Sequence, residues 1–257
     1  MLIFGDKEIN MLRLLTTICL AFLSSCAPHY YIYEVKNVSK QVSNGKFFAF
    51  ENDTVKITYS FWAENGTMAF SVYNKLNIPI YIDWKKSSMV RNGSKVDYWK
   101  DEVRNSGSYF SNLFSGIIND ETAVSIGQGV WSSRTMKPER ITFLTPSSGI
   151  TRVQSKLFIY PNVPVKKPYS LGTLERHNGD KTSTLKYNSF NEENSPLSFR
   201  NFLTLSTRED FTNETYVDNY FYVANIYDAN SRELLWKRNN KGQVEWTLSN
   251  PKWFFVK

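Results

Sequence analysis

Apolar and polar residues alternate along Val55–Phe61, and this period of two constrains the fold more than any other feature of the chain. Apolar residues hold the odd positions of the segment and polar residues the even ones. Because successive side chains of a β-strand point to opposite faces, the alternation predicts a strand with one buried and one solvated face. Met68–Tyr73 and Ile78–Trp84 continue the pattern. We therefore expect an antiparallel three-stranded meander over residues 55–84, with the isoleucines and the tryptophan of the third segment on its buried face.

Two Asn-Gly pairs mark turns between predicted strands. Asn65-Gly66 separates the first two segments of the meander, and Asn92-Gly93 precedes Val96–Trp99. Both residue types tolerate the positive φ that tight hairpin turns require. Further strands are expected near residues 30–35, 47–51, 141–145, 152–160, 197–206 and 217–227. Many short strands separated by Gly, Asn and Pro predict an all-β chain with an antiparallel, β-sandwich-like fold, a β-rich C-terminal half and a few short helical turns.

The residue composition of three further segments predicts how the chain is organised. Tyr220–Tyr227 is apolar on both faces, so we expect a central strand covered on both sides. Residues 100–130 contain Gly and Ser clusters and predict a long loop with a helical turn. Residues 161–195 contain three prolines and polar runs and are expected to connect two halves. The expected organisation is a lipoprotein signal peptide over 1–25, a lipidated tether over 26–29, an N-terminal β-sandwich region over 30–160, the connecting segment 161–195, and a C-terminal β-rich region over 196–257 packed on the same domain.

The N-terminus carries a lipoprotein signal. Leu12–Leu23 is an apolar stretch of about a dozen residues, which is shorter than the roughly 20 residues of a membrane-spanning helix but typical of a signal-peptide core. Leu23-Ser24-Ser25-Cys26 follows and is similar to a bacterial lipobox, in which small residues precede an acylated cysteine. We therefore expect Cys26 to be lipidated, since several acyl chains on one residue give stable membrane anchoring. The alternative is a buried N-terminal helix with Cys26 in the core. Translation starts at Met1 or at Met11.

Several segments of the chain are similar to a known group of proteins. They are Tyr30–Tyr33 after the lipobox, Asn74-Lys75 before Ile80–Trp84, and Leu197–Leu203. In these segments the chain resembles uncharacterised lipoproteins of Bacteroidota bacteria. The resemblance implies a lipid-anchored envelope protein with a β-rich fold. It assigns no catalytic residue.

The chain offers few residues for metal or nucleophilic chemistry. Its two His and two Cys exclude most zinc sites and any disulfide scaffold. Neither a Gly-x-Ser-x-Gly elbow nor a glycine loop of the phosphate-binding type occurs. We therefore expect no catalytic residue, no metal and no cofactor. Two of the 24 acidic residues can meet in space without leaving a sequence pattern, so a carboxylate-dependent hydrolase stays one alternative.

Charge and aromatic residues bear on possible partners. The net charge is +7, but the basic residues are spread along the chain, so no nucleic-acid partner is expected. Trp84 and Trp99 are each followed by Lys. On a strand these neighbours point to opposite faces, so the first interpretation places the tryptophan in the core and the lysine in water. The second interpretation places Trp84 and Trp99 on the rim as stacking platforms for sugar rings.

These observations favour a non-enzymatic protein held at the bacterial cell envelope. We expect a structural or interaction module anchored in the membrane through acylated Cys26, at the outer membrane or the periplasmic face. The expected partner is an envelope protein or a glycan. The two alternatives are a glycan-binding surface lipoprotein that uses exposed Trp or Tyr, and the hydrolase.

Overall fold

The protein is an antiparallel β-structure. The computed structural model describes residues 29–39, 42–44, 47–100, 104–106, 115–117, 123–125, 134–136, 139–157, 163–175, 182–229, 235–246 and 248–257. Every regular element within these ranges is a strand, and all strand pairs are antiparallel. The predicted all-β, sandwich-like class is confirmed, whereas the predicted short helical turns do not occur in the described part of the chain.

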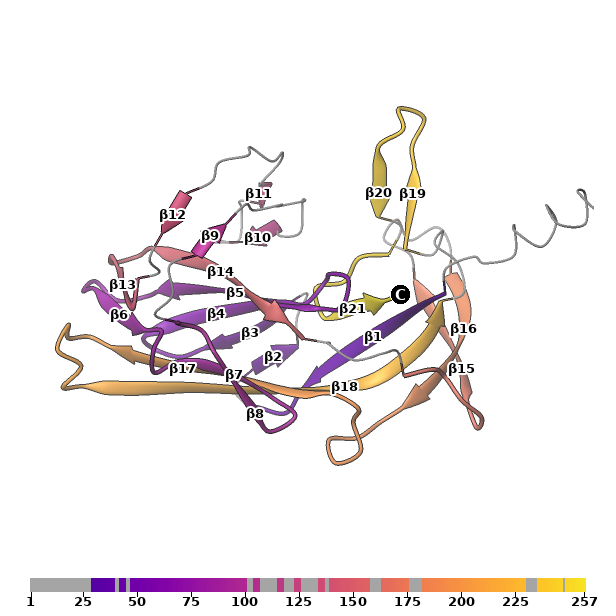
Figure 1. The fold of residues 1–257 in the computed structure, drawn as a ribbon, viewed down its shortest axis with the longest axis horizontal. Coiled ribbons are helices and arrows are strands. Elements are labelled where there is room, and N and C mark those ends of the chain that lie inside the picture. The colour runs from indigo at the N-terminus through magenta and orange to yellow at the C-terminus, as the bar shows by residue number, and fades with distance from the viewer. Residues whose placement is uncertain are drawn as a thin grey trace, which may run out of the picture.

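A five-stranded sheet forms one layer of the sandwich (Figure 1). Its strands are β2 (Val42–Asn44), β3 (Phe48–Glu51), β4 (Val55–Ser60), β5 (Thr67–Asn74) and β14 (Gly149–Lys156). Their spatial order is β14-β5-β4-β3-β2. The expected turns are present, because Asn65 and Gly66 both have positive φ and so do Asn92 and Gly93.

A ten-stranded sheet forms the other layer. Its strands are β1 (Tyr30–Asn37), β6 (Ile80–Asp83), β7 (Ser88–Arg91), β8 (Ser94–Asp97), β13 (Ile141–Leu144), β15 (Ser170–Glu175), β16 (Thr182–Ser189), β17 (Ser198–Ser206), β18 (Glu214–Ala229) and β21 (Trp253–Val256). The main path runs β13-β6-β17-β18-β1-β21, with β7 and β8 branching from β17, and β16 and β15 from β18.

Three short two-stranded sheets complete the set. They are β9 (Arg104–Ser106) with β12 (Arg134–Met136), β10 (Ser115–Ile117) with β11 (Ala123–Ser125), and β19 (Trp236–Arg238) with β20 (Val244–Trp246). The β19–β20 hairpin stands away from the sandwich in Figure 1. The stretch predicted as a long loop over 100–130 therefore contains short strands where it is described.

The predicted three-stranded meander over residues 55–84 is wrong in its third strand. β4 and β5 pair as expected, but β6 crosses to the other sheet, where it pairs with β13 and β17. The Asn74 side chain holds the crossing by donating to the carbonyl oxygens of Ile78 and Leu144, at 2.9 and 3.2 Å. Ile78 lies in the crossing and is 46% exposed, so its predicted burial is wrong as well. Alternation specifies the faces of a strand but not its partners.

Strands from distant parts of the sequence share the ten-stranded sheet. β17 and β18, from the C-terminal region, lie between β6–β7 and β1, which come from the N-terminal region. Residues 161–195, expected to be a connection, contribute the β15–β16 hairpin to the same sheet. The N-terminal and C-terminal regions therefore share one sheet and do not form two separate halves.

The main core lies between the two sheets and is rich in aromatic side chains. The largest fully buried side chains are Trp84, Tyr33, Tyr59, Phe48, Phe61, Phe70, Phe199, Phe221, Phe254, Ile32, Ile57 and Met68. A second, smaller cluster lies at the end of the ten-stranded sheet where the β15–β16 hairpin joins β18, and contains Tyr30, Ile32, Leu174, Leu185 and Tyr227. The predicted coverage of both faces of 220–227 is therefore confirmed near Tyr227, whereas Tyr220 and Tyr222 are only half-buried.

Candidate functional site

Trp84 and Trp99, the residues predicted to stack on sugar rings, do not lie exposed side by side on the rim of the sandwich. The Trp84 side chain is fully buried, its indole N–H donates to Thr142 at 2.7 Å, and the Arg152 guanidinium lies 4.0 Å from its ring centroid. A stacking role for Trp84 is therefore wrong, because no ligand can reach the ring. Trp99 is half-buried against the main core, with the Lys85 ammonium 5.8 Å from its ring centroid. Cys26 lies outside the described residues.

A bulge between β6 and β7 explains the burial of Trp84. Both strands lie along one edge of β17, where Tyr81 faces Ser206 and Ser88 faces Phe202. Between the pairs Ile82–Leu205 and Ser88–Phe202, the β6–β7 side has five residues, 83–87, against two on β17, and Trp84 among them is buried in the main core.

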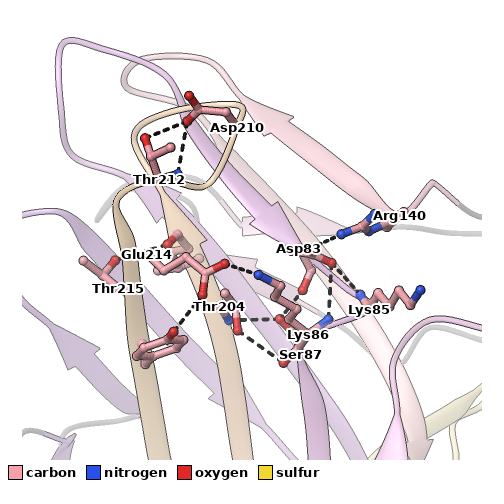
Figure 2. A network of polar contacts seen from close by, with 12 residues as sticks. Asp83, Lys85, Lys86, Ser87, Arg140, Thr204, Asp210, Thr212, Glu214 and Thr215 are labelled. Atoms are coloured by element: carbon pink, nitrogen blue, oxygen red, sulfur yellow. Dashed lines mark hydrogen bonds and ion pairs between the residues drawn. The ribbon is translucent and has the colours of Figure 1, made fainter.

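Asp83 organises this bulge (Figure 2). One carboxylate oxygen accepts the backbone N–H groups of Lys85 and Lys86 at 2.9 and 3.2 Å, and the other accepts Arg140 at 2.9 Å. The side chain of Ser87 donates to the Asp83 carbonyl at 2.7 Å. Asp83 is completely buried, and a buried carboxylate is tolerated because these donors compensate its charge.

The same bulge aims Lys86 across β17 at Glu214 (Figure 2). Glu214 also accepts the hydroxyl of Tyr216 at 2.7 Å. The hydrogen bond to Lys86, and then the one to Tyr216, lowers the pKa of Glu214, and the Glu214 carboxylate raises the pKa of Lys86. Asp83 and Glu214 thus lie on either side of one lysine, and each bonds to protein donors through both carboxylate oxygens. This arrangement supports a structural role for the two acids.

Polar side chains also cross the sandwich core. The Tyr59 hydroxyl accepts the amides of Asn201 and Asn219 at 2.9 and 2.7 Å, and Tyr98 donates to Asn201 at 2.7 Å. Asn201 and Asn219 are direct partners on β17 and β18. Burial raises the pKa values of Tyr59 and Tyr98 well above the ordinary value. The network joins the two sheets, with Tyr59, Asn201 and Asn219 closed to solvent and Tyr98 half-buried at its end.

The outer face of the same strand pair is open. We call Arg200, Phe202, Tyr216, Asp218 and Tyr220 the outer strip. They alternate with buried residues along β17 and β18, and none of the five is buried. Arg200 binds Asp218 through two nitrogens, and the rings of Phe202 and Tyr216 stack with centroids 5.6 Å apart. Tyr216 is 58% exposed, so the strip offers aromatic surface to a ligand.

A groove lies at one end of the outer strip. It is an open depression of about 460 Å³ between the β7–β8 turn and the two long strands, lined by Val90, Asn92, Gly93, Ser198, Phe199, Arg200, Asp218 and Tyr220. A second open depression of about 560 Å³ is lined by Asn191, Glu192, Glu193 and again Tyr220. Because Tyr220 borders both depressions, we call them together the Tyr220 groove.

Sequence reasoning missed this site although it placed both strands. The segments 197–206 and 217–227 were predicted as strands, and Phe202 stands on the polar side of the first alternation. What the sequence lacks is the register that sets Arg200 beside Tyr220 and Phe202 beside Asp218. The only available signal was Phe202 on the polar side of its alternation, because the segment that contains Tyr220 was expected to be covered on both faces.

Within the described ranges, no group of three or more His, Cys, Asp or Glu side chains is arranged to hold a metal ion. No helix of the described residues is long and apolar enough to cross a membrane.

Comparison with known proteins gives no match to this chain, whether with protein-family models, with curated proteins or with solved structures.

Proposed function

We propose that the chain is a binding protein held at the bacterial cell envelope by a lipid on Cys26, with the outer strip as its recognition surface. The observation that carries the proposal is the open aromatic and polar strip on β17 and β18. Half-buried and exposed aromatic rings on a rigid sheet, next to a charged pair, provide contact area with little loss of side-chain entropy on binding. The lipobox at residues 23–26 and the resemblance to Bacteroidota lipoproteins support the anchored location.

The anchor is tested by fractionation of the full-length chain in a bacterial host. Wild-type protein is expected in the membrane fraction, with the mass of Cys26 increased by acyl groups. Cys26→Ala is expected in the soluble fraction, because a polypeptide without acyl chains lacks this means of anchoring. Equal fractionation of both proteins, together with an unmodified Cys26, would contradict the anchored location.

The recognition surface is tested by pull-down from envelope extracts. Immobilised full-length wild-type protein is compared with the double variant Phe202→Ala, Tyr216→Ala, which removes the exposed ring stack without touching the core. The matched control is Tyr169→Ala, since Tyr169 is also exposed and precedes β15, outside the strip. We expect envelope protein or carbohydrate to be retained by the wild type and the control and lost from the double variant. Equal retention by all three would overturn the assignment of the strip.

A further inference from the structure

The Tyr220 groove has one aromatic side chain at its centre. Tyr220 borders both depressions, and residues 38–39 hold its backbone, with its N–H donating to the Ser39 hydroxyl at 2.8 Å and its carbonyl accepting the N–H of Val38 at 2.9 Å. Its hydroxyl makes no hydrogen bond to another described residue. A ring fixed at its base, with an unengaged hydroxyl, is suited to pack on the apolar face of a sugar ring and to bond one of its hydroxyl groups.

The charged pair beside Tyr220 supplies hydrogen-bonding groups. Arg200 donates to both carboxylate oxygens of Asp218 through Nε and one terminal nitrogen. The remaining guanidinium N–H groups and carboxylate lone pairs are free for a ligand, because a guanidinium has five donors and a carboxylate about four acceptor sites. The adjacent donors of Arg200 and acceptors of Asp218 match neighbouring hydroxyl groups of a sugar, because each hydroxyl group both donates and accepts a hydrogen bond.

The charge around the groove restricts the ligand further. Three carboxylates, Asp218, Glu192 and Glu193, line it against one guanidinium, although the whole chain has a net charge of +7. Glu192 and Glu193 form no ion pair with another described residue and stand on a turn in which Asn191 and Asn194 bond each other at 2.7 and 3.0 Å. This acidic end repels carboxylate and sulfate groups and attracts ammonium groups.

We propose that the Tyr220 groove binds a glycan chain of neutral or amino sugars and disfavours acidic ones. The inference rests on the proposed function as a binding protein and names its ligand. The two depressions that Tyr220 borders, of about 460 and 560 Å³, each give room for more than one sugar ring. The stacking platform that the sequence suggested at Trp84 and Trp99 is thus supplied by a tyrosine on β18.

The test is an array of immobilised oligosaccharides that contains neutral, amino, uronic-acid and sulfated members. The probe is fluorescently labelled full-length protein in detergent micelles. We expect retention on neutral and amino sugars, and at least tenfold weaker retention on uronic-acid and sulfated sugars. Tyr220→Ala should weaken retention about tenfold, which corresponds to the loss of one stacked ring and one hydrogen bond. Tyr169→Ala, the control on an exposed tyrosine outside the groove, should stay within about twofold of the wild type.

A second variant keeps the test independent of any folding defect in Tyr220→Ala. Glu192→Gln combined with Glu193→Gln changes two exposed side chains on a surface turn. It should weaken binding of amino sugars more than that of neutral sugars and should not reduce binding of neutral ones more than about threefold. Best retention on acidic sugars, no retention on any member, or equal losses for Tyr220→Ala and Tyr169→Ala would each overturn the inference.

The outcome is separable from that of the proposed function. If the envelope pull-down yields a protein partner that depends on Phe202 and Tyr216 while the array stays empty, the binding function stands and the glycan inference fails. If neither experiment yields a ligand, both proposals fail.

Discussion

The two faces of the β17–β18 pair place polar side chains in opposite situations. On the inner face Asn201 and Asn219 are buried and bonded to Tyr59, in a network closed to water. On the outer face, one residue earlier along each strand, Arg200 and Asp218 bond each other in contact with solvent. A buried polar group costs free energy unless it is fully bonded, whereas an exposed group can exchange its partner for water or for a ligand. The inner face therefore contributes to stability, whereas the outer face is the one that we propose as the binding surface.

We expect the largest difference in stability between substitutions at Ile80 and Tyr81, two neighbouring residues of β6 that point to opposite faces. Ile80→Asp should unfold the domain, because Ile80 is 1% exposed and an unpaired carboxylate there costs several kcal/mol, comparable to a typical total stability of roughly 5–15 kcal/mol. Tyr81→Asp should cost about 1 kcal/mol, through the lost contact with Phe143 at a ring distance of 5.5 Å. Thermal unfolding of the two full-length variants measures the difference. Greater damage from Tyr81→Asp would mean that the outer face is covered.

The next effect concerns the buried amides. Asn201→Ala removes the acceptor of Tyr98 and one donor to Tyr59. Two buried hydroxyl groups then lose partners, so we expect a loss of about 2–4 kcal/mol in the free energy of unfolding, measured by urea titration. Arg200→Ala, one residue away on the outer face, is the control and should lose about 1 kcal/mol or less. Similar losses for the two variants would remove the distinction between the faces.

The sequence predicted which side chains of a strand are buried better than it predicted which strands pair with one another. The alternation around Ile80 and Tyr81 correctly assigned which side chain is buried, because that depends only on local periodicity. It could not show that β6 leaves β5 for β17, since strand pairing depends on contacts between residues more than a hundred positions apart. The candidate site was missed for the same reason: Arg200, Asp218 and Asn92 come together only through the register of three strands.

The buried tyrosines of the core predict how the free energy of unfolding depends on pH. Burial raises the pKa of Tyr33 to about 12, against an unfolded value near 10. The raised pKa means that the native state keeps its proton while the unfolded state loses it, so the contribution of Tyr33 is complete below pH 10 and falls between pH 10 and 12. We expect a decline of about 1 kcal/mol between pH 10 and 11 from this residue, with Tyr59 and Tyr98 acting in the same direction.

Urea unfolding at pH 9, 10 and 11, with tyrosinate absorbance as a second signal, measures this decline. The free energy of unfolding of Tyr33→Phe should fall less than that of the wild type, by about 1 kcal/mol between pH 10 and 11 and by only about 0.3 kcal/mol between pH 9 and 10, because phenylalanine does not ionise. Tyr169→Phe, at an exposed position, should match the wild type. An unchanged slope for Tyr33→Phe would mean that the Tyr33 hydroxyl is accessible to solvent in the native state.

The smallest expected effect is the most informative for the outer face. A double-mutant cycle of Arg200→Ala and Asp218→Ala measures the coupling of a pair whose side chains are 43% and 37% exposed. Exposed ion pairs couple by roughly 0.2–1 kcal/mol, because water competes for both partners and holding two side chains costs entropy. Raising the salt concentration to about 1 M should reduce the coupling further, since screening then acts over about 3 Å. A coupling above about 2 kcal/mol that resists salt would require a pair shielded from water. In that case the groove beside Tyr220 would be covered in solution, and its ligand would have to displace whatever covers it.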